Sequence, residues 1–216
     1  MAVQPIPNMS DTPSSPASKP RRIGRPALRD QAPGPDTRTL LLQAATAEFV
    51  EFGFANTDTN RIARRANFAP QTFYRWYKDK LDVFIQVYRA WEEAEIEMLD
   101  AMLTEQATSL QIAEAFVESY RSFLVFRRNL RQLACESADI RKAVADSRRR
   151  QIEQIKRWNP AFTSDEHIAT LIVQMDRVCE ALAEGEFEEL GLSGSGAYEV
   201  LSGSIDQLRR PTAAQA

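Results

Sequence analysis

Four polar side chains that could contact nucleic acid follow one another closely in the chain: Gln71, Thr72, Tyr74 and Arg75. We expect them on a short helix from Ala69 to Tyr77, because Pro70 suits a first helical turn, where the missing N–H needs no partner. The aromatic residues of this stretch would then pack inward, away from the polar group: Phe68, Phe73, Trp76 and Tyr77. Amide, hydroxyl and guanidinium groups contact base edges and phosphates, so the pattern favours a helix that enters the major groove of DNA.

A second short helix is expected immediately before this one, over residues 58–66. Asp58 or Thr59 can accept hydrogen bonds from its free N–H groups, and its apolar residues fall on one face. Asn67 follows where the chain must turn sharply, and asparagine enters left-handed geometry at low cost. Two short helices joined by a tight turn predict a helix-turn-helix. Lys80, just beyond it, is placed to meet a phosphate at the start of the next helix.

Residues 37–80 as a whole resemble the N-terminal domain of the TetR (tetracycline-repressor) family of bacterial transcriptional regulators. The matching positions are Thr37-Arg38, Leu41-Leu42, Ala44-Ala45, Phe49, Gly53-Phe54, Thr59, Ile62-Ala63, Ala66, Thr72-Phe73-Tyr74, Trp76-Tyr77 and Lys80. The sequence departs from the family pattern at three positions, where Asn67, Ala69 and Gln71 replace the usual Gly, the usual Ser and a common Gly. The resemblance implies DNA contacts, to phosphates and bases near the start of the second helix and along the recognition helix, for Thr59, Asn60, Gln71, Thr72, Tyr74 and Lys80.

The first 35 residues are rich in Pro, Ser and polar residues without apolar periodicity, and we expect a disordered basic arm. Arg25 lies there in Gly24-Arg25-Pro26, which resembles the core of an AT-hook and could enter a narrow minor groove. A solvated basic linker that attracts DNA nonspecifically explains the same residues equally well. Residues 1–80 carry 12 Lys and Arg against 7 Asp and Glu, whereas residues 81–216 carry 15 against 23. This asymmetry favours nucleic-acid contact at one end of the chain.

The remaining composition argues against an enzyme. The single histidine, His167, has no cysteine or second histidine at metal-ligand spacing, and neither a phosphate-binding glycine loop nor a Gly-x-Ser-x-Gly motif occurs. We therefore expect no catalytic residue, no metal and no cofactor. No run approaches 18 apolar residues and the N-terminus has no signal pattern, so we expect a cytoplasmic protein without membrane contact. The family resemblance further implies a bacterial protein associated with the nucleoid. Two distant cysteines, Cys135 and Cys179, are expected to stay reduced.

Helical periodicity runs through the rest of the 216 residues, and no strand pattern occurs. We expect an all-α fold of about nine helices. A three-helix head over residues 36–82 would precede a larger helical ligand-binding and dimerisation domain over residues 83–210 and a disordered tail over residues 211–216. The expected helices cover residues 36–52, 58–66, 69–77, 80–104, 109–128, 130–135, 140–158, 163–190 and 197–210.

The resemblance further implies a ligand cavity in the larger domain and a dimer contact on its last two long helices. The candidate cavity residues are Trp91, Met98, Met102, Phe116, Tyr120, Phe123, Trp158 and Met175. Ordinary core packing explains the same stripes, because they have helical spacing. The candidate interface residues are Ile168, Leu171, Ile172, Met175, Cys179, Leu182, Leu201, Ile205 and Leu208. A two-fold dimer would bring two heads to half-sites in successive major grooves.

Together these patterns predict a homodimeric, sequence-specific transcriptional regulator. The main hypothesis is a repressor that a small apolar or aromatic effector releases from a palindromic operator. The alternative is a DNA-binding regulator of the same fold that has no small-molecule effector and is either controlled by a protein partner or constitutively active. An internal cavity in the larger domain would separate the two hypotheses.

Overall fold

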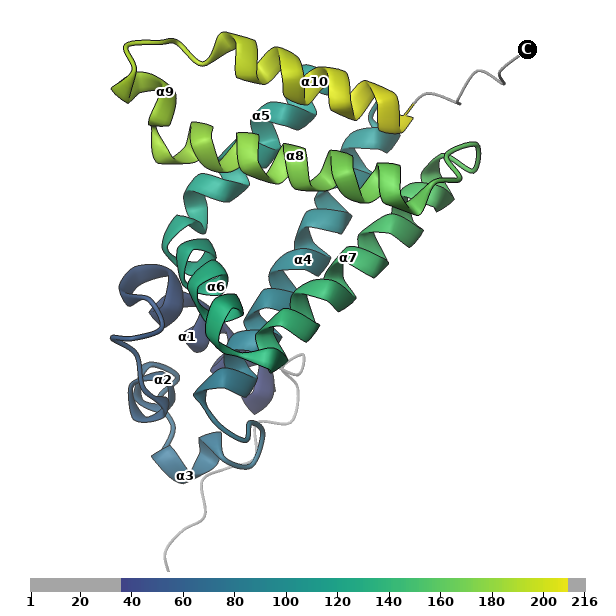
Figure 1. Cartoon of the computed structure of the whole chain (residues 1–216). Coiled ribbons are helices and arrows are strands. Elements are labelled where there is room, and N and C mark those ends of the chain that lie inside the picture. The colour runs from purple at the N-terminus through teal and green to yellow at the C-terminus, as the bar shows by residue number, and fades with distance from the viewer. Residues whose placement is uncertain (1–35, 210–216) are drawn as a thin grey trace, which may run out of the picture. The chain divides into compact units, whose positions relative to one another are not determined.

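The computed structural model describes residues 36–209, so the basic arm with Arg25, and residues 210–216, lie outside the described part. The described residues form ten helices and no strand (Figure 1), which confirms the all-α prediction. The helices are α1 (Thr37–Phe52), α2 (Thr59–Arg65), α3 (Pro70–Phe73), α4 (Lys80–Thr104), α5 (Ser109–Ser122), α6 (Leu124–Glu136), α7 (Ala138–Trp158), α8 (Asp165–Glu184), α9 (Glu186–Glu189) and α10 (Ser195–Arg209). None of these helices is both long enough and apolar enough to cross a membrane.

Six of the helices begin at a residue whose side chain accepts a hydrogen bond from the backbone N–H three residues on. These capping residues are Asp36, Asp58, Asp79, Thr108, Ser137 and Ser164. At Thr108 the bond is reciprocal, because the Gln111 side chain accepts from the Thr108 N–H at 2.8 Å. Each cap satisfies a donor that the helix leaves unpaired, and it depends on local sequence alone. The starts of these helices therefore lie close to the expected residues.

Two of the expected helix ends in the larger domain are wrong. The helix expected over residues 109–128 is interrupted at Phe123, and α6 then begins at Leu124 and continues through Arg127 to Asn129. The change of direction lets Phe126 pack against α1 and α4, while Tyr120 packs against α8 and α10. The helix expected to reach residue 190 ends at Glu184, because Gly185 adopts a left-handed conformation with φ of 80°.

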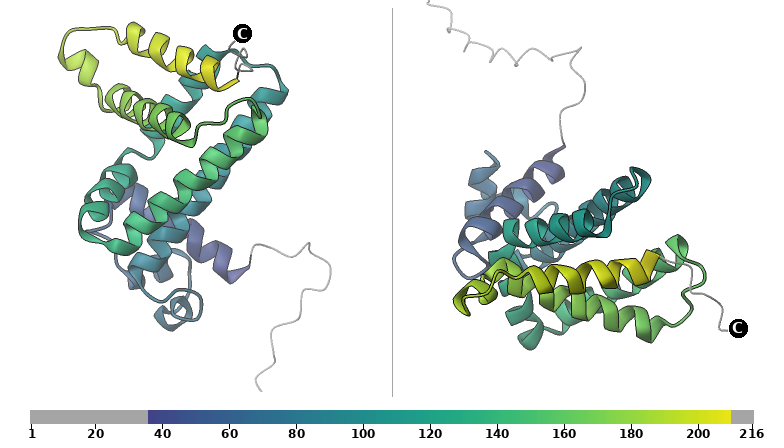
Figure 2. Two further views of the ribbon diagram at one scale, coloured as in Figure 1. Left: turned by 45° about the vertical axis from the view of Figure 1, so that its right-hand side comes forward. Right: turned by 90° about the horizontal axis from the view of Figure 1, so that it is seen from above.

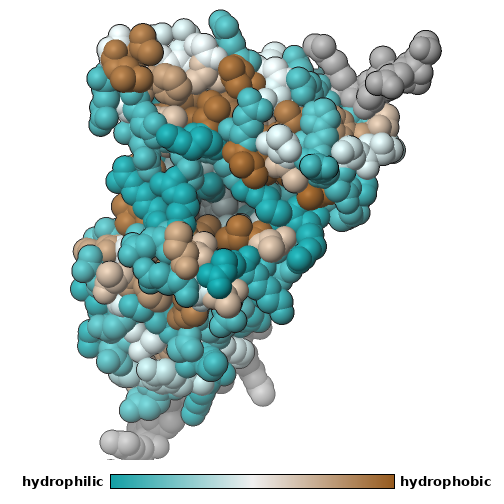
Figure 3. All heavy atoms as spheres, viewed as in Figure 1, coloured by the Kyte–Doolittle hydropathy of each residue, from teal (hydrophilic) through white to brown (hydrophobic). Residues whose placement is uncertain are grey.

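The two longest helices, α4 and α7, run from the end that holds α1, α2 and α3 to the opposite end, where α8 and α10 lie across them (Figures 1 and 2). There α5 packs against both α8 and α10. Helix α6 lies closer to the head and contacts α1 and α7. Apolar residues gather on the surface over the end formed by α8, α9 and α10, whereas the middle of the same face is mainly hydrophilic (Figure 3).

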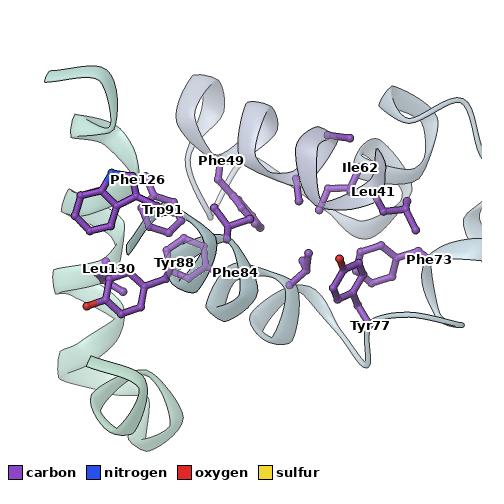
Figure 4. Close-up of a cluster of buried hydrophobic side chains, with 14 of the residues drawn as sticks. Leu41, Phe49, Ile62, Phe73, Tyr77, Phe84, Tyr88, Trp91, Phe126 and Leu130 are labelled. Carbon is purple, nitrogen blue, oxygen red and sulfur yellow. The ribbon is translucent and has the colours of Figure 1, made fainter. Parts of the chain in front are cut away.

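One hydrophobic core joins the three-helix head to the larger domain. Buried side chains from α1, α2 and the recognition segment continue without a break into α4, α6 and α7 (Figure 4). Phe84 lies at the junction, with its ring centroid 5.0 Å from that of Phe49 and 4.4 Å from that of Phe126. The expected division at residue 82 therefore does not coincide with a gap in the packing. A second core lies among α5, α8 and α10.

Candidate functional site

The recognition segment is shorter as a regular helix than expected. Helix α3 covers only Pro70–Phe73, and a turn follows in which the Trp76 and Tyr77 N–H groups both donate to the Phe73 carbonyl at 3.0 Å. Tyr77 is pulled inward, and its hydroxyl donates to the Arg38 carbonyl at 3.2 Å. The expected turn before the segment is confirmed, since Asn67 has φ of 60°. The unit is therefore one helical turn plus a tight turn, held by α1 and α2.

The polar and apolar faces of this segment separate largely as expected. Phe73 and Tyr77 are buried beside Leu41 and Ile62 (Figure 4), and Phe68 is half-buried. The opposite face presents Gln71, Tyr74 and Arg75 as exposed residues, with Thr72 half-buried. Trp76 was expected to point inward, but it is 46% exposed because the backbone leaves helical geometry after Phe73. It adds an exposed aromatic ring to the polar face.

Helix α2 meets the recognition segment at its own first turn. The Thr59 and Tyr74 hydroxyls share a hydrogen bond of 2.9 Å, which joins the start of α2 to the exposed side of the recognition segment. Asn60, next to Thr59, is exposed. The structure therefore brings Thr59 and Tyr74 together, and the DNA contacts of Thr59, Asn60 and Tyr74 stay a prediction.

Lys80 makes contacts within the chain, and its expected phosphate contact stays a prediction. Its ammonium donates to the Phe54 carbonyl at 2.7 Å and to the Thr57 carbonyl at 2.9 Å, and it lies 4.0 Å from the centre of the Phe54 ring. Burial lowers the pKa of this ammonium, against the opposing effect of the Asp58 carboxylate. An ammonium has three donors, and the α1–α2 turn uses two of them here. Lys80 therefore fastens this turn to the start of α4.

Some basic residues of α2 and of the recognition segment form ion pairs with residues that the structure describes, and others do not. The sequence pattern does not distinguish the two groups. The buried Glu48 of α1 accepts from Arg61 at 2.9 Å and from Arg65 at 3.2 Å, so both guanidiniums help to fix α2 on α1. Arg64 and Arg75 are exposed and form no ion pair with any described residue. Arg64 and Arg75 therefore carry positive charge that no described residue neutralises.

The larger domain contains a cavity of about 350 Å³ enclosed by α4, α5, α7, α8 and α10. Four of the expected lining residues are there: Phe116, Tyr120, Trp158 and Met175. The other four do not line it. Trp91 and Phe123 pack in the core shared with the head, Met102 packs with the second core, and Met98 is half-buried elsewhere on α4. Helical spacing puts all eight on inward faces but does not show which face meets an empty space.

The cavity wall is more polar than the aromatic candidates suggested. Besides aliphatic side chains it includes Glu92, Glu95, Gln151, Gln154, Asp176 and Arg209. Asp176 forms an ion pair with Arg148 and accepts a hydrogen bond from the Tyr120 hydroxyl. Arg127 lies 3.5 Å from the centre of the Tyr120 ring and 3.8 Å from oxygens of both Asp176 and Glu180. Charged residues of α6, α7 and α8, together with the Tyr120 hydroxyl of α5, thus form a connected network beside the cavity.

Most of the residues predicted for the dimer contact are buried within the single chain, and their part in a dimer contact stays a prediction. Ile168, Leu171, Ile172, Cys179, Leu182, Leu201 and Ile205 belong to the cores of one chain, and Met175 and Leu208 line the cavity. Helix α8 packs against α5, α7 and α10, so its main apolar stripe is buried by helices of the same chain. The exposed apolar residues of this end are Val173, Leu190, Leu192 and Val200, of which Leu190 is 72% exposed.

Comparison with known protein families places the head among bacterial regulators. Residues 41–87 match the family described as "Bacterial regulatory proteins, tetR family". This stretch begins in α1, includes α2 and the recognition segment, and ends in the first turns of α4. The matched residues therefore include the whole surface assembled above.

Relatives and solved structures extend the likeness to most of the chain. The Fatty acid metabolism regulator protein of Bacillus subtilis (strain 168) is 23% identical over 167 residues, which are 77% of this chain and 78% of that protein. A TetR-family transcriptional regulator from Syntrophomonas wolfei has the same fold, with a TM-score of 0.59 at 15% identity over 82% of this chain and 97% of its own. A transcriptional regulator from Saccharomonospora viridis, solved in complex with choline, gives a TM-score of 0.57 at 16% identity over 78% and 95% of the two chains.

Proposed function

We propose that this chain, which is a TetR-family transcriptional regulator, acts as a homodimeric repressor that a small molecule in the α4–α10 cavity releases from a palindromic operator. The observation that carries the proposal is the recognition segment. Its aromatic anchors Phe73 and Tyr77 are buried, while Gln71, Tyr74 and Arg75 are exposed on one face. A surface of this kind, on a matched DNA-binding domain, is what base and phosphate contacts require.

On DNA, we assign the reading of bases to Gln71 and the contact with the backbone to Arg75. A glutamine side chain can make two hydrogen bonds to an adenine edge in the major groove, whereas an arginine with no internal partner is available to a phosphate. Thr59, Asn60, Thr72 and Tyr74 surround these two residues and would fix the orientation of the head. Arg25 in the N-terminal arm stays a prediction, as does its entry into the minor groove.

A dimer is proposed because two heads must reach two half-sites roughly 34 Å apart, or a multiple of that distance. The exposed apolar residues of α8, α10 and the segment between them offer a contact surface for a second copy. The α10 glycines Gly196 and Gly203 have open space beside them, so a partner helix could approach this face closely. Two-fold pairing would place this surface against itself.

The cavity favours the hypothesis of regulation by a small-molecule effector over the hypothesis of a regulator without an effector. Its volume of about 350 Å³ falls in the range of roughly 300–1,000 Å³ that is usual for ligand sites. One relative is named as a regulator of fatty acid metabolism, and one structural neighbour was solved with choline bound. Both support a small-molecule effector for this chain. Helix α4 begins beside the recognition segment and carries Glu92 and Glu95 on the cavity wall. A ligand that binds one tilt of α4 more tightly would shift the spacing of the heads.

Gln71→Ala tests the DNA-reading assignment. Operator fragments are first selected from genomic DNA with the purified protein, and affinities for the selected duplex and for a scrambled duplex are then titrated. The variant should lose about 1–3 kcal/mol on the operator and little on the scrambled duplex. Gln132→Ala, at an exposed glutamine of α6 outside the recognition segment and α2, is the matched control and should change neither affinity. An equal loss on both duplexes would remove Gln71 as a reader of bases.

A further inference from the structure

The cavity has a charged end and an apolar end. Glu92 and Glu95 lie in the middle of α4, and Asp176 approaches them from α8. Further along α4, toward its C-terminus, the wall becomes aliphatic with Leu99 and Leu103. Apolar side chains from α5, α7 and α10 continue this part of the wall: Ile112, Ile155, Ile205 and Leu208.

Two of the three carboxylates are neutralised by arginines of the protein, and one is not. Glu92 forms an ion pair with Arg150, and Asp176 forms one with Arg148. Glu95 makes no ion pair with any described residue, and its one hydrogen bond is accepted from the Ser119 hydroxyl at 2.9 Å. In addition, Oε1 of Glu92 is buried without a hydrogen-bond partner. The charged end of the cavity therefore carries acceptor capacity and negative charge that the chain itself does not satisfy.

The groups that face Glu95 do not remove this excess. They are Glu92 on α4, Tyr120 on α5, Arg127 on α6, Arg148 on α7, and Asp176 and Cys179 on α8. Burial raises the pKa of the Cys179 thiol to about 12 and that of the Tyr120 hydroxyl further still, so both stay neutral. The two arginines are held by Asp176, and Arg127 also by Glu180. Neither arginine forms an ion pair with Glu95, although both attract its negative charge and Nε of Arg127 has no hydrogen-bond partner among the described residues.

We propose that the cavity binds an organic cation, an amine or a quaternary ammonium on an apolar body, with its charge beside Glu95 and Glu92 and its body against the aliphatic end. The inference rests on the proposed effector-binding role of the cavity and names the class of effector. An apolar body alone would leave the charged end unsatisfied. An anion would meet the unpaired Glu95 carboxylate and the unpartnered Oε1 of Glu92. Among the described residues of the wall, the cation at the aliphatic end is Arg209, which already donates to the Ala107 carbonyl at 2.9 Å and to the Ser109 hydroxyl at 3.3 Å.

The state of Glu95 adds a pH signature. Burial raises the pKa of Glu95 to about 7, although Arg127 and Arg148 act in the opposite direction. A bound cation favours the ionised form, so binding must expel the Glu95 proton at low pH. Affinity for a cation with a fixed charge should therefore rise about ten-fold from pH 6 to pH 8. A neutral ligand would show no such rise.

The experiment compares three probes of equal chain length by isothermal titration calorimetry with the full chain: decyltrimethylammonium, decanol and decanoate, each below its micelle concentration. Decyltrimethylammonium should bind most tightly and show the rise with pH. Decanoate should bind about ten-fold more weakly or not at all. Glu95→Gln keeps the shape of the side chain and should weaken the cation about ten-fold and remove its pH dependence. Glu93→Gln, at an exposed glutamate of the same helix, should leave both unchanged.

The outcomes separate this inference from the proposed function. Preferential binding of decanoate, or no binding of decyltrimethylammonium to the wild-type chain, would overturn the cation proposal. So would wild-type affinity and pH dependence in Glu95→Gln. Operator binding is titrated with the same preparations, so a chain that binds operator but not the cation keeps its role as a regulator. A chain that binds the cation but no duplex would instead lose the repressor assignment and keep the cation site.

Discussion

Glu95 is proposed to bind the ligand, and its ionised form lowers the stability of the folded chain. Its carboxylate lines the cavity and is half-buried, and burial raises its pKa from an ordinary value of 4.5 to about 7. The folded chain therefore holds this proton more tightly than the unfolded chain does. Between these two pKa values each rise in pH costs the folded state stability, and the full cost is present above pH 7. Such a cost is expected where a binding site keeps a charge for its ligand.

Glu95→Gln should consequently stabilise the free protein at pH 8 and change little at pH 4.5, where the wild-type carboxyl is largely protonated when folded. An increase of a few degrees in Tm is expected at pH 8, since roughly 1 kcal/mol corresponds to about 2–4 °C in a chain of this size. Thermal melts of wild type, Glu95→Gln and Glu93→Gln at both pH values measure it. A variant that melts below wild type at pH 8 would contradict the direction of the Glu95 pKa shift.

Side-chain directions in the head were predicted correctly where the backbone stays helical, and beyond α3 the prediction holds for Tyr77 but not for Trp76. Phe73 and Gln71 lie in the regular turn of α3, and they face the core and the solvent as their spacing predicts. Trp76 lies beyond that turn, so helical spacing no longer describes its direction. Lys80 is a different case, because its partners Phe54 and Thr57 come from the α1–α2 turn, more than 20 residues earlier. A local pattern carries no information about such a contact.

At the scale of elements, the Lys80 contacts make the start of α4 part of the head. Lys80→Met keeps the apolar stem but leaves the Phe54 and Thr57 carbonyls without their charged donor. We expect a loss of about 1–3 kcal/mol in the free energy of unfolding, measured by urea denaturation. Lys78→Met, at an exposed lysine two residues earlier, is the control and should cost little.

The salt dependence of operator binding distinguishes the two roles of Lys80. If its ammonium serves the α1–α2 turn, the folded Lys80→Met protein should keep the wild-type slope of log affinity against log salt. A slope flatter by about one unit would instead show that Lys80 neutralises a phosphate on DNA.

Helix starts were easier to predict than helix ends in this chain. A start is marked by a capping residue such as Thr108 or Ser164, and the hydrogen bond that it makes is local. The break at Phe123 has no glycine or proline to mark it, and it arises because the flanking turns pack into two different cores. Gly185 lies inside the range expected for this helix, and it ends the helix at Glu184. Tertiary packing therefore decides the first case and left-handed glycine geometry the second.

At the scale of the whole molecule, the contact between two copies was the part least accessible to sequence. The stripes of α8 and α10 show that these helices bury apolar surface, but not whether the same chain or a second one covers it. In the structure Ile172 and Leu201 are covered by their own chain, and what remains open is a narrower set that includes Val173 and Val200. The cavity was implied by family resemblance, whereas its charged end required the three-dimensional positions of Glu92, Glu95 and Asp176.

The dimer proposal predicts that Val173→Glu and Val200→Glu each convert the protein to a monomer. In a two-fold contact the new carboxylate of each chain would be buried against the second chain without a cation beside it. The free energy lost by burying this charge would exceed what the modest apolar surface contributes to dimerisation. Sedimentation equilibrium measures the molecular mass of each variant in solution. A variant with the mass of a monomer should also bind a full palindrome with lower affinity. Leu110→Glu, at an equally exposed apolar residue on α5, should stay dimeric. Retention of the dimer in both Val variants would place the contact elsewhere.

The core that passes from Phe49 through Phe84 to Phe126 also determines where such regulators could be recombined. A graft of residues 36–82 onto a foreign sensor would separate Phe49 and Phe54 from the Phe84 ring against which both pack. A chimera would have to transfer the first turns of α4 and the Phe126–Leu130 stretch of α6 together with the head. New sensing specificity is therefore better introduced by redesigning the cavity wall than by joining halves of two proteins at residue 82.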